Sequence, residues 1–349
     1  MVNGLSQATW NRGRSADWHS SAPSTPVPAR WLSNAEVDFL ESRWTGYESR
    51  QGLYGPVTEY VNDVSHQRQV VFIKPAGLWL LVDFMRYSPE IKGPDDLHVR
   101  LPAKVSPSPY TFTQIWNFAP PRDEARHHFG FGNDQVQIDE AKQRVATNDP
   151  AGANLELLHF GGKQLQYRKF FGHKDEKQYL GWLVDGKGAP GSPRVDVHAS
   201  WEQSREELAS GNVLPLVTVI APSRNTNSIL TAAKPRVEEA GRIAGCELTT
   251  TGNLAVAALA SAVPAKLKVG SLVAHAELLV VFTRPGEKVQ RGMLLGCTGL
   301  HVGEQWDAWR PVETPDFAFA FDGKNLSEIQ AITIPGGEPA VLTTSAAAQ

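Results

Sequence analysis

The sequence predicts an all-β protein, a large antiparallel β-sandwich of two packed sheets with many short strands and few short helices. Segments of strand length with alternating apolar and polar residues recur along the whole chain, at a spacing of about 8–12 residues. The 349 residues include 30 Gly and 24 Pro, and these turn-forming residues separate the segments. No fixed-period repeat is visible, which argues against a propeller or a solenoid.

The first strong pattern is a hairpin in "VSHQRQVVFIKPAGLWLLVDFM", residues 64–85. Lys-Pro-Ala-Gly reads as a turn between two strands. Alternation predicts one shared face of the hairpin. That face would hold His66, Arg68, Val70 and Phe72 from the first strand, and Trp79, Leu81 and Asp83 from the second. The preceding segment "EVDFLESRWTGYES", residues 36–49, fits the entry of a further strand better than a long helix.

The rest of the chain continues in the same way. In "YTFTQIWNFAP", residues 110–120, alternation places Phe112, Gln114, Trp116 and Phe118 on one side. Only residues 204–211 and 236–245 are plausible short helices. We expect residues 1–222 to form the main sandwich region. Residues 223–349 would be a strand-rich continuation that packs on the same sandwich.

Composition excludes several classes of protein. A formal net charge of -3 and a pI near 6.4 predict no basic surface for nucleic acid. No apolar run reaches the roughly 18–20 residues of a membrane span. The first residues do not follow the pattern of a secretory signal. Cys246 and Cys297 could form one bridge or remain two free thiols.

The hairpin raises one catalytic hypothesis. His66 and Asp83 face each other across it, and a carboxylate beside an imidazole suits acid–base chemistry. The alternative is that His66, Arg68 and Asp83 form a polar cluster that closes one end of the sheet. We predict no metal site, because the chain has no CxxC or HExxH motif. The adjacent pair His127-His128 would point in opposite directions on an extended chain.

Aromatic residues beside polar groups are candidates for stacking on sugar rings, although buried ones would only fill the core. They occur at residues 44–47, 116–117, 182 and 306–309. The substrate-binding candidates are therefore Tyr47, His66, Arg68, Trp116 and Asn117.

The order "VNGLSQ … DFLESRWTGY … VSHQRQVVFIKPAGLWLLVDFM … YTFTQIWNFAP … GWLVDG … LPLVTVIAP" resembles the C-terminal β-sandwich region of heparinase II/III-like polysaccharide lyases. The resemblance is best over residues 2–120 and thins out after residue 222. Its most specific part is the hairpin, which recurs in that family as two adjacent strands.

The resemblance implies β-elimination on glycans that contain uronic acids, in a periplasmic, cell-envelope or secreted protein. In the family, an α/α toroid precedes the sandwich and supplies a catalytic tyrosine and histidine. The sandwich begins with "HxDxGxF", "DxG" and "HNT" motifs and, in several members, a zinc site. This chain has none of those motifs in that order and looks as if it begins inside the sandwich. No catalytic residue, metal or cofactor carries over.

Three hypotheses follow. The chain is the sandwich part of a lyase, inactive alone, whose partners are an acidic polysaccharide or oligosaccharide and a separate toroid chain. Alternatively, it is a non-catalytic carbohydrate-binding or scaffolding β module. The third hypothesis is an autonomous enzyme that uses His66, Arg68 and Asp83.

Overall fold

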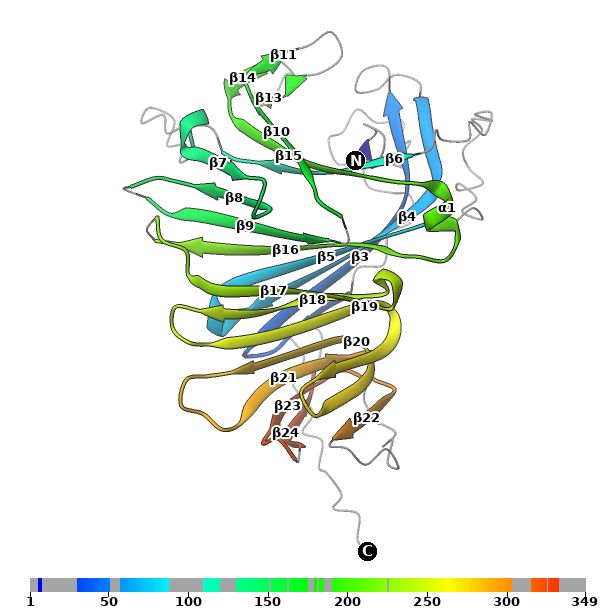
Figure 1. Cartoon of the computed structure of the whole chain (residues 1–349), viewed down its shortest axis with the longest axis vertical. Helices are drawn as coiled ribbons and strands as arrows, with labels where there is room; N and C mark the ends of the chain where they lie inside the picture. Colours follow the sequence, from blue (N-terminus) through cyan, green and yellow to red (C-terminus); the bar gives the residue numbers. More distant parts are fainter. Residues whose placement is uncertain are drawn as a thin grey trace, which may run out of the picture.

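The computed structural model describes residues 6–7, 30–50, 57–87, 109–119, 130–150, 152–161, 163–174, 179–180, 182–184, 190–224, 226–302, 315–324 and 326–332. Within these ranges, the residues are overwhelmingly in antiparallel strands, as the sequence predicts. The strands form three layers that pack as a sandwich (Figure 1).

A nine-stranded sheet forms the middle layer, in the order β1-β3-β4-β5-β16-β9-β8-β7, with β2 also paired to β3. Its strands are β1 (Ser6–Gln7), β2 (Arg30–Ser33), β3 (Val37–Arg50), β4 (Val57–Ile73), β5 (Leu78–Tyr87), β7 (Val136–Asp139), β8 (Arg144–Thr147), β9 (Asn154–Gly161) and β16 (Leu214–Ser223). A short 3-10 turn, η2 (Asn133–Gln135), leads into β7.

A three-stranded sheet covers part of one face of the middle layer, near the top of Figure 1. Its strands are β10 (Gln166–Phe171), β15 (Val195–Gln203) and β6 (Tyr110–Asn117), in that order. Two small ladders join the same part of the chain: β11 (His173–Lys174) with β12 (Tyr179–Leu180), and β13 (Trp182–Val184) with β14 (Pro190–Pro193).

An eight-stranded sheet packs on the opposite face of the middle layer and forms the lower half of Figure 1. Its strands are β17 (Leu230–Glu238), β18 (Ile243–Thr250), β19 (Ala255–Val269), β20 (Leu272–Thr283), β21 (Gln290–Leu295), β22 (Gly299–Val302), β23 (Phe317–Phe321) and β24 (Leu326–Ala331). The predicted boundary after residue 222 falls at the last residue of β16, Ser223, and the two-part division stays a prediction.

The β4–β5 hairpin lies in the middle layer and presents different residues to the two outer layers. Its turn is the 3-10 segment η1 (Lys74–Ala76), followed by Gly77 with φ of +62°, a conformation that glycine adopts without strain. This turn sets the register in which Arg68 lies opposite Asp83. The predicted shared face of the hairpin is therefore correct.

Two apolar cores follow from this alternation. Leu80, Val82 and Phe84 of β5 pack with Cys246 and Val256 of the eight-stranded sheet. On the other face, the core beneath the three-stranded sheet includes Met85, Leu216, Phe112, Val197 and Trp201. A third core lies within the eight-stranded sheet, around Leu279 and Phe317.

The short helix predicted at residues 204–211 is present as α1 (Arg205–Ala209), because Ser204 and Glu207 form a capping box. The helix predicted at residues 236–245 is wrong. That segment is the end of β17, a 3-10 turn η3 (Glu239–Gly241) and the start of β18. Its acidic residues gave a helical pattern, but pairing with β19 fixes the second half as a strand.

Cys246 and Cys297 are free, buried thiols, which resolves the alternative that the sequence left open. Burial raises the pKa of both, that of Cys297 to about 11, so neither is primed as a thiolate nucleophile. None of the helices in the described ranges is long and apolar enough to cross a membrane.

Candidate polar sites on the two faces of the hairpin

The side chain of Asp83 is the centre of the first site, which lies between the middle layer and the three-stranded sheet. His66 Nε2 lies 2.7 Å from its Oδ1, and Arg68 binds both oxygens, at 2.6 and 2.9 Å. Gln114 Nε2 donates to Oδ2 at 3.1 Å, and Gln114 Oε1 accepts from Thr218 at 3.1 Å. We call these five residues the Asp83 cluster.

The Asp83 carboxylate is saturated with donors. It is 1% exposed, and burial alone opposes its ionisation. Nevertheless the charges of Arg68 and His66, and the hydrogen bonds from both, hold the pKa of Asp83 well below its usual range. It is therefore a permanent anion with no oxygen left for a substrate proton.

A chain of hydrogen-bonded aromatic side chains, Trp116, His159 and Tyr167, extends the Asp83 cluster across the sheet; we call these three residues the relay. Trp116 Nε1 lies 3.1 Å from Gln114 Oε1 and 3.0 Å from His159 Nε2. The other nitrogen of His159, Nδ1, lies 3.0 Å from the hydroxyl of Tyr167. Two side chains of β6, Gln114 and Trp116, thus contact residues of β5, β16 and β9.

Donor chemistry fixes the protonation of His159. An indole N–H can only donate, so Nε2 of His159 accepts and carries no proton. The proton then sits on Nδ1 and is donated to Tyr167. Burial lowers the pKa of His159 to about 4, which agrees with a neutral ring.

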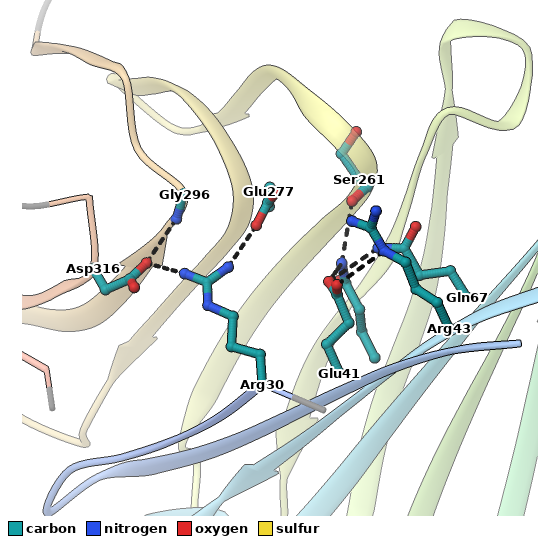
Figure 2. A network of polar contacts seen from close by, with 9 residues as sticks. Arg30, Glu41, Arg43, Gln67, Ser261, Glu277, Gly296 and Asp316 are labelled. Atoms are coloured by element: carbon teal, nitrogen blue, oxygen red, sulfur yellow. Dashed lines mark hydrogen bonds and ion pairs between the residues drawn. The ribbon is translucent and has the colours of Figure 1, made fainter. Parts of the chain in front are cut away.

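A second polar site lies on the opposite face of the same hairpin, toward the eight-stranded sheet (Figure 2). Glu41 Oε2 accepts from the amides of Gln67 and Gln69, at 2.9 and 3.1 Å, and Glu41 Oε1 accepts from Arg43 at 3.2 Å. Arg86 Nη2 donates to Gln67 Oε1 at 3.2 Å. We call these five residues the Glu41 cluster.

The Glu41 cluster touches the next layer through Ser261, whose backbone carbonyl accepts from Gln69 at 3.2 Å (Figure 2). Farther along the same interface, Arg30 of β2 donates to Glu277 at 2.6 Å and also contacts Asp316. Asp316 in turn accepts from the backbone of Gly296 at 2.9 Å. Through the contacts of Arg30, the edge strand β2 is bound to the eight-stranded sheet.

Part of the middle layer beside the three-stranded sheet presents apolar side chains toward solvent. Trp31 lies opposite Leu40, and Leu40 opposite Val70, in one row across β2, β3 and β4. Trp31 is 57% exposed and Leu40 41%. The half-buried rings of Phe72 and Trp79 form the next row, stacked with their centroids 4.3 Å apart. We call these five residues the open face.

The structure brings together three of the predicted site residues: His66 and Arg68 in the Asp83 cluster, and Trp116 in the relay beside it. Asn117 is exposed and donates to Asp196 at 3.0 Å, away from them. Tyr47 lies in β3 opposite Val61, and its side chain is outside the described residues. Their role in binding stays a prediction.

Other sequence candidates fall outside the description. These are His127-His128, the side chains of Trp44 and Trp182, and the pair Trp306–Trp309. Among the residues that the structure does describe, no group of three or more His, Cys, Asp or Glu could hold a metal ion.

Sequence reasoning missed His159 and Tyr167. His159 sits at an inward position of β9, between Leu157 and Gly161. A polar residue at an inward position is a signal of a buried network. Gln114, flanked by Phe112 and Trp116, carried the same signal.

No family model and no curated protein matches the sequence. Solved structures that are similar include a heparinase III (15% identity, TM-score 0.39, 66% of this chain and 27% of that chain). The heparan sulfate lyase HepC from Pedobacter heparinus is similar at 14% identity and TM-score 0.39, over 66% of this chain and 27% of that one. A further heparinase III structure is similar at 14% identity and TM-score 0.39, over 71% of this chain and 32% of that one. The chain thus spans about a third or less of the length of these structures.

Proposed function

We propose that this chain is a non-catalytic β-sandwich of the kind found in heparinase II/III-like polysaccharide lyases, and that it binds an acidic polysaccharide or oligosaccharide on its open face. The hairpin motif that carries the family resemblance supports the class. In this proposal the protein works in the periplasm, at the cell envelope or outside the cell, and a separate toroid chain would supply the elimination chemistry.

The binding role rests on one observation: Arg68 lies next to the open face, on the same side of the sheet. Trp31 and Leu40 expose apolar surface large enough to stack on sugar rings. Arg68 lies one row away on β4, and 39% of its side chain is exposed. An apolar platform beside a guanidinium matches a glycan that carries carboxylate or sulfate groups.

The third hypothesis, an autonomous enzyme, is supported less well. A general base needs a free lone pair and a pKa near the working pH. Asp83 accepts four hydrogen bonds, and its pKa lies far below neutrality. His159 is buried between Trp116 and Tyr167. The Asp83 cluster therefore serves the sheet packing and holds Arg68 in place.

Calorimetric titration of the full chain with size-matched hexasaccharides of hyaluronan, heparan sulfate and alginate tests the proposal, with cellohexaose as the neutral control. We expect at least one acidic glycan to bind, more weakly at high salt, and the neutral glycan to bind less. Trp31→Ala should weaken binding roughly fivefold, since one aromatic contact contributes about 1 kcal/mol.

The matched control is Phe171→Ala, which removes another exposed aromatic ring, on β10. Its affinity should equal that of the unmodified chain. Equal losses in both variants, self-association through the open face instead of glycan binding, or no acidic ligand at all would each refute the binding role. A rise in the ultraviolet absorbance of unsaturated uronide on mixing the chain with these glycans would refute the non-catalytic part.

A further inference from the structure

The Glu41 cluster holds more positive than negative charge. Arg43 and Arg86 carry two positive charges, and Glu41 carries the single negative charge in contact with either of them among the described residues. Arg86 forms its hydrogen bond to an amide oxygen, that of Gln67, and contacts no described carboxylate. Burial and the charge of Arg43 lower the pKa of Arg86 by more than the charge of Glu41 raises it, so one positive charge of the cluster stays unbalanced among the described residues.

The strand register places the two guanidinium groups on either side of one side chain. Arg43 lies directly opposite Gln67 on the neighbouring strand, and Arg86 hydrogen-bonds to Gln67 from β5. Burial lowers the pKa of Arg86, and the charge of Arg43 lowers it further. Both guanidinium groups therefore lie beside the Gln67 side chain, close enough for each to feel the charge of the other.

Buried amide groups lie on the inner side of the two guanidinium groups. Gln67 and Gln69 are 1% and 0% exposed, and Oε1 of Gln69 has no hydrogen-bond partner. At the outer end, 53% of the Arg43 side chain is exposed. Arg43 thus lies on the solvent side of the cluster, and Gln69 lies on its buried side, in contact with Ser261 of the next layer (Figure 2).

We propose that Arg43 and Arg86 form a binding site for an oxyanion, a carboxylate or sulfate group, at the mouth of the interface between the middle and eight-stranded sheets. The anion would bring the cluster to neutrality. Guanidinium groups donate paired N–H bonds in the geometry that such oxyanions accept. This site is on the face opposite Arg68 and does not depend on glycan binding at the open face.

The test uses the full chain with sodium sulfate and sodium glucuronate as probes, each compared with sodium chloride at equal ionic strength. In ¹⁵N spectra of arginine side chains, the Nε–H signals of Arg43 and Arg86 should shift in a saturable way with at least one probe. Arg236 is the internal reference, because Glu238 and Glu247 already neutralise it. Its signal should drift in proportion to concentration or stay unchanged.

Thermal unfolding provides the second measurement. The binding anion should raise the Tm of the unmodified chain with the logarithm of its concentration, once that concentration exceeds the Kd. In Arg86→Met the apparent affinity should fall roughly tenfold or more, as expected when a charge-assisted contact is lost. In Arg236→Met it should not change.

The general stabilisation by sulfate that acts through exclusion from the surface rises in proportion to concentration and is the same in all variants. Signals of Arg43 and Arg86 that follow Arg236 with both probes would overturn the proposal. So would a logarithmic rise of the Tm with anion concentration that persists unchanged in Arg86→Met. Binding of sulfate but not glucuronate identifies a sulfated ligand, and the reverse identifies a uronate. Either result supports the site, whatever the glycan titration shows.

Discussion

The two faces of one hairpin carry two polar clusters of opposite character. In the Asp83 cluster, one carboxylate accepts four hydrogen bonds and is balanced by the guanidinium of Arg68. In the Glu41 cluster, one carboxylate faces two guanidinium groups, and an amide oxygen of Gln69 remains unpaired. The residue types are almost the same, but the balance of charges and hydrogen bonds differs.

This difference separates a structural role from a binding role. A buried network in which every group is satisfied holds strands in register, and the Asp83 cluster reaches a ligand only through the exposed part of Arg68. A network with a surplus cation is incomplete until an anion joins it. The location between sheets is common to both clusters, so location alone does not decide function.

Breaking the Asp83 cluster should have the largest effect. Asp83→Asn keeps the shape but removes the charge that Arg68, His66 and Gln114 share. We expect a loss of about 3 kcal/mol in the free energy of unfolding, because removing one partner leaves a partly buried cation unpaired. Urea denaturation at pH 7 measures it.

The control for this substitution is Asp38→Asn. Asp38 pairs with Lys74 at 2.8 Å, and about a third of each side chain is exposed. This change should cost less than about 1 kcal/mol. Equal losses in the two variants would show that the Asp83 cluster contributes no more than a surface ion pair.

Sequence alone could predict the hairpin part of this comparison. The alternation in β4 and β5 and the tight turn between them bring His66, Arg68 and Asp83 onto one face, and the structure has them there. The resemblance to a lyase sandwich and the many short strands predicted the β-sandwich architecture.

Sequence could not predict which layer covers which face of the hairpin. Gln114 and His159 join the network only because β6 packs over the middle layer. Gln114 is 31 residues from Asp83 in the sequence, and His159 is 43 residues from Trp116. In the same way, Gln69 meets Ser261 across a separation of 192 residues. Contacts of this kind depend on how sheets pack, which no local pattern encodes.

The relay beside the Asp83 cluster predicts a pH dependence of intermediate size. The pKa of His159 is about 4 in the folded protein, against 6.5 as its ordinary value. Between these values the unfolded chain binds a proton that the folded chain does not. Stability is therefore complete above pH 6.5 and falls as the pH drops toward 4, by about 2 kcal/mol between pH 7 and pH 5.

His159→Gln removes this titration while keeping an acceptor for Trp116 and a donor for Tyr167. Urea denaturation at pH 7 and pH 5 should therefore show a smaller difference in the variant than in the unmodified chain, by about that 2 kcal/mol. The pKa of His198 is also lowered by burial, so part of the pH dependence will remain. An unchanged pH dependence in His159→Gln would show that the ring is not neutral and buried in solution.

The smallest effect should come from Glu41→Gln, and it sharpens the distinction between the two clusters. The amide removes the one negative charge near Arg43 and Arg86 but keeps an oxygen for Gln67 and Gln69. We expect a loss of about 1.5 kcal/mol in the free energy of unfolding, the size of one hydrogen bond to a charged group. Because the variant has a larger surplus of positive charge, added sulfate should restore more stability to it than to the unmodified chain. The matched control is His159→Gln, whose site is buried and carries no charge at pH 7, so sulfate should stabilise it no more than the unmodified chain. Equal recovery in Glu41→Gln and His159→Gln would mean that the Glu41 cluster has no special access to anions, and the contrast between a closed and an incomplete network would fail.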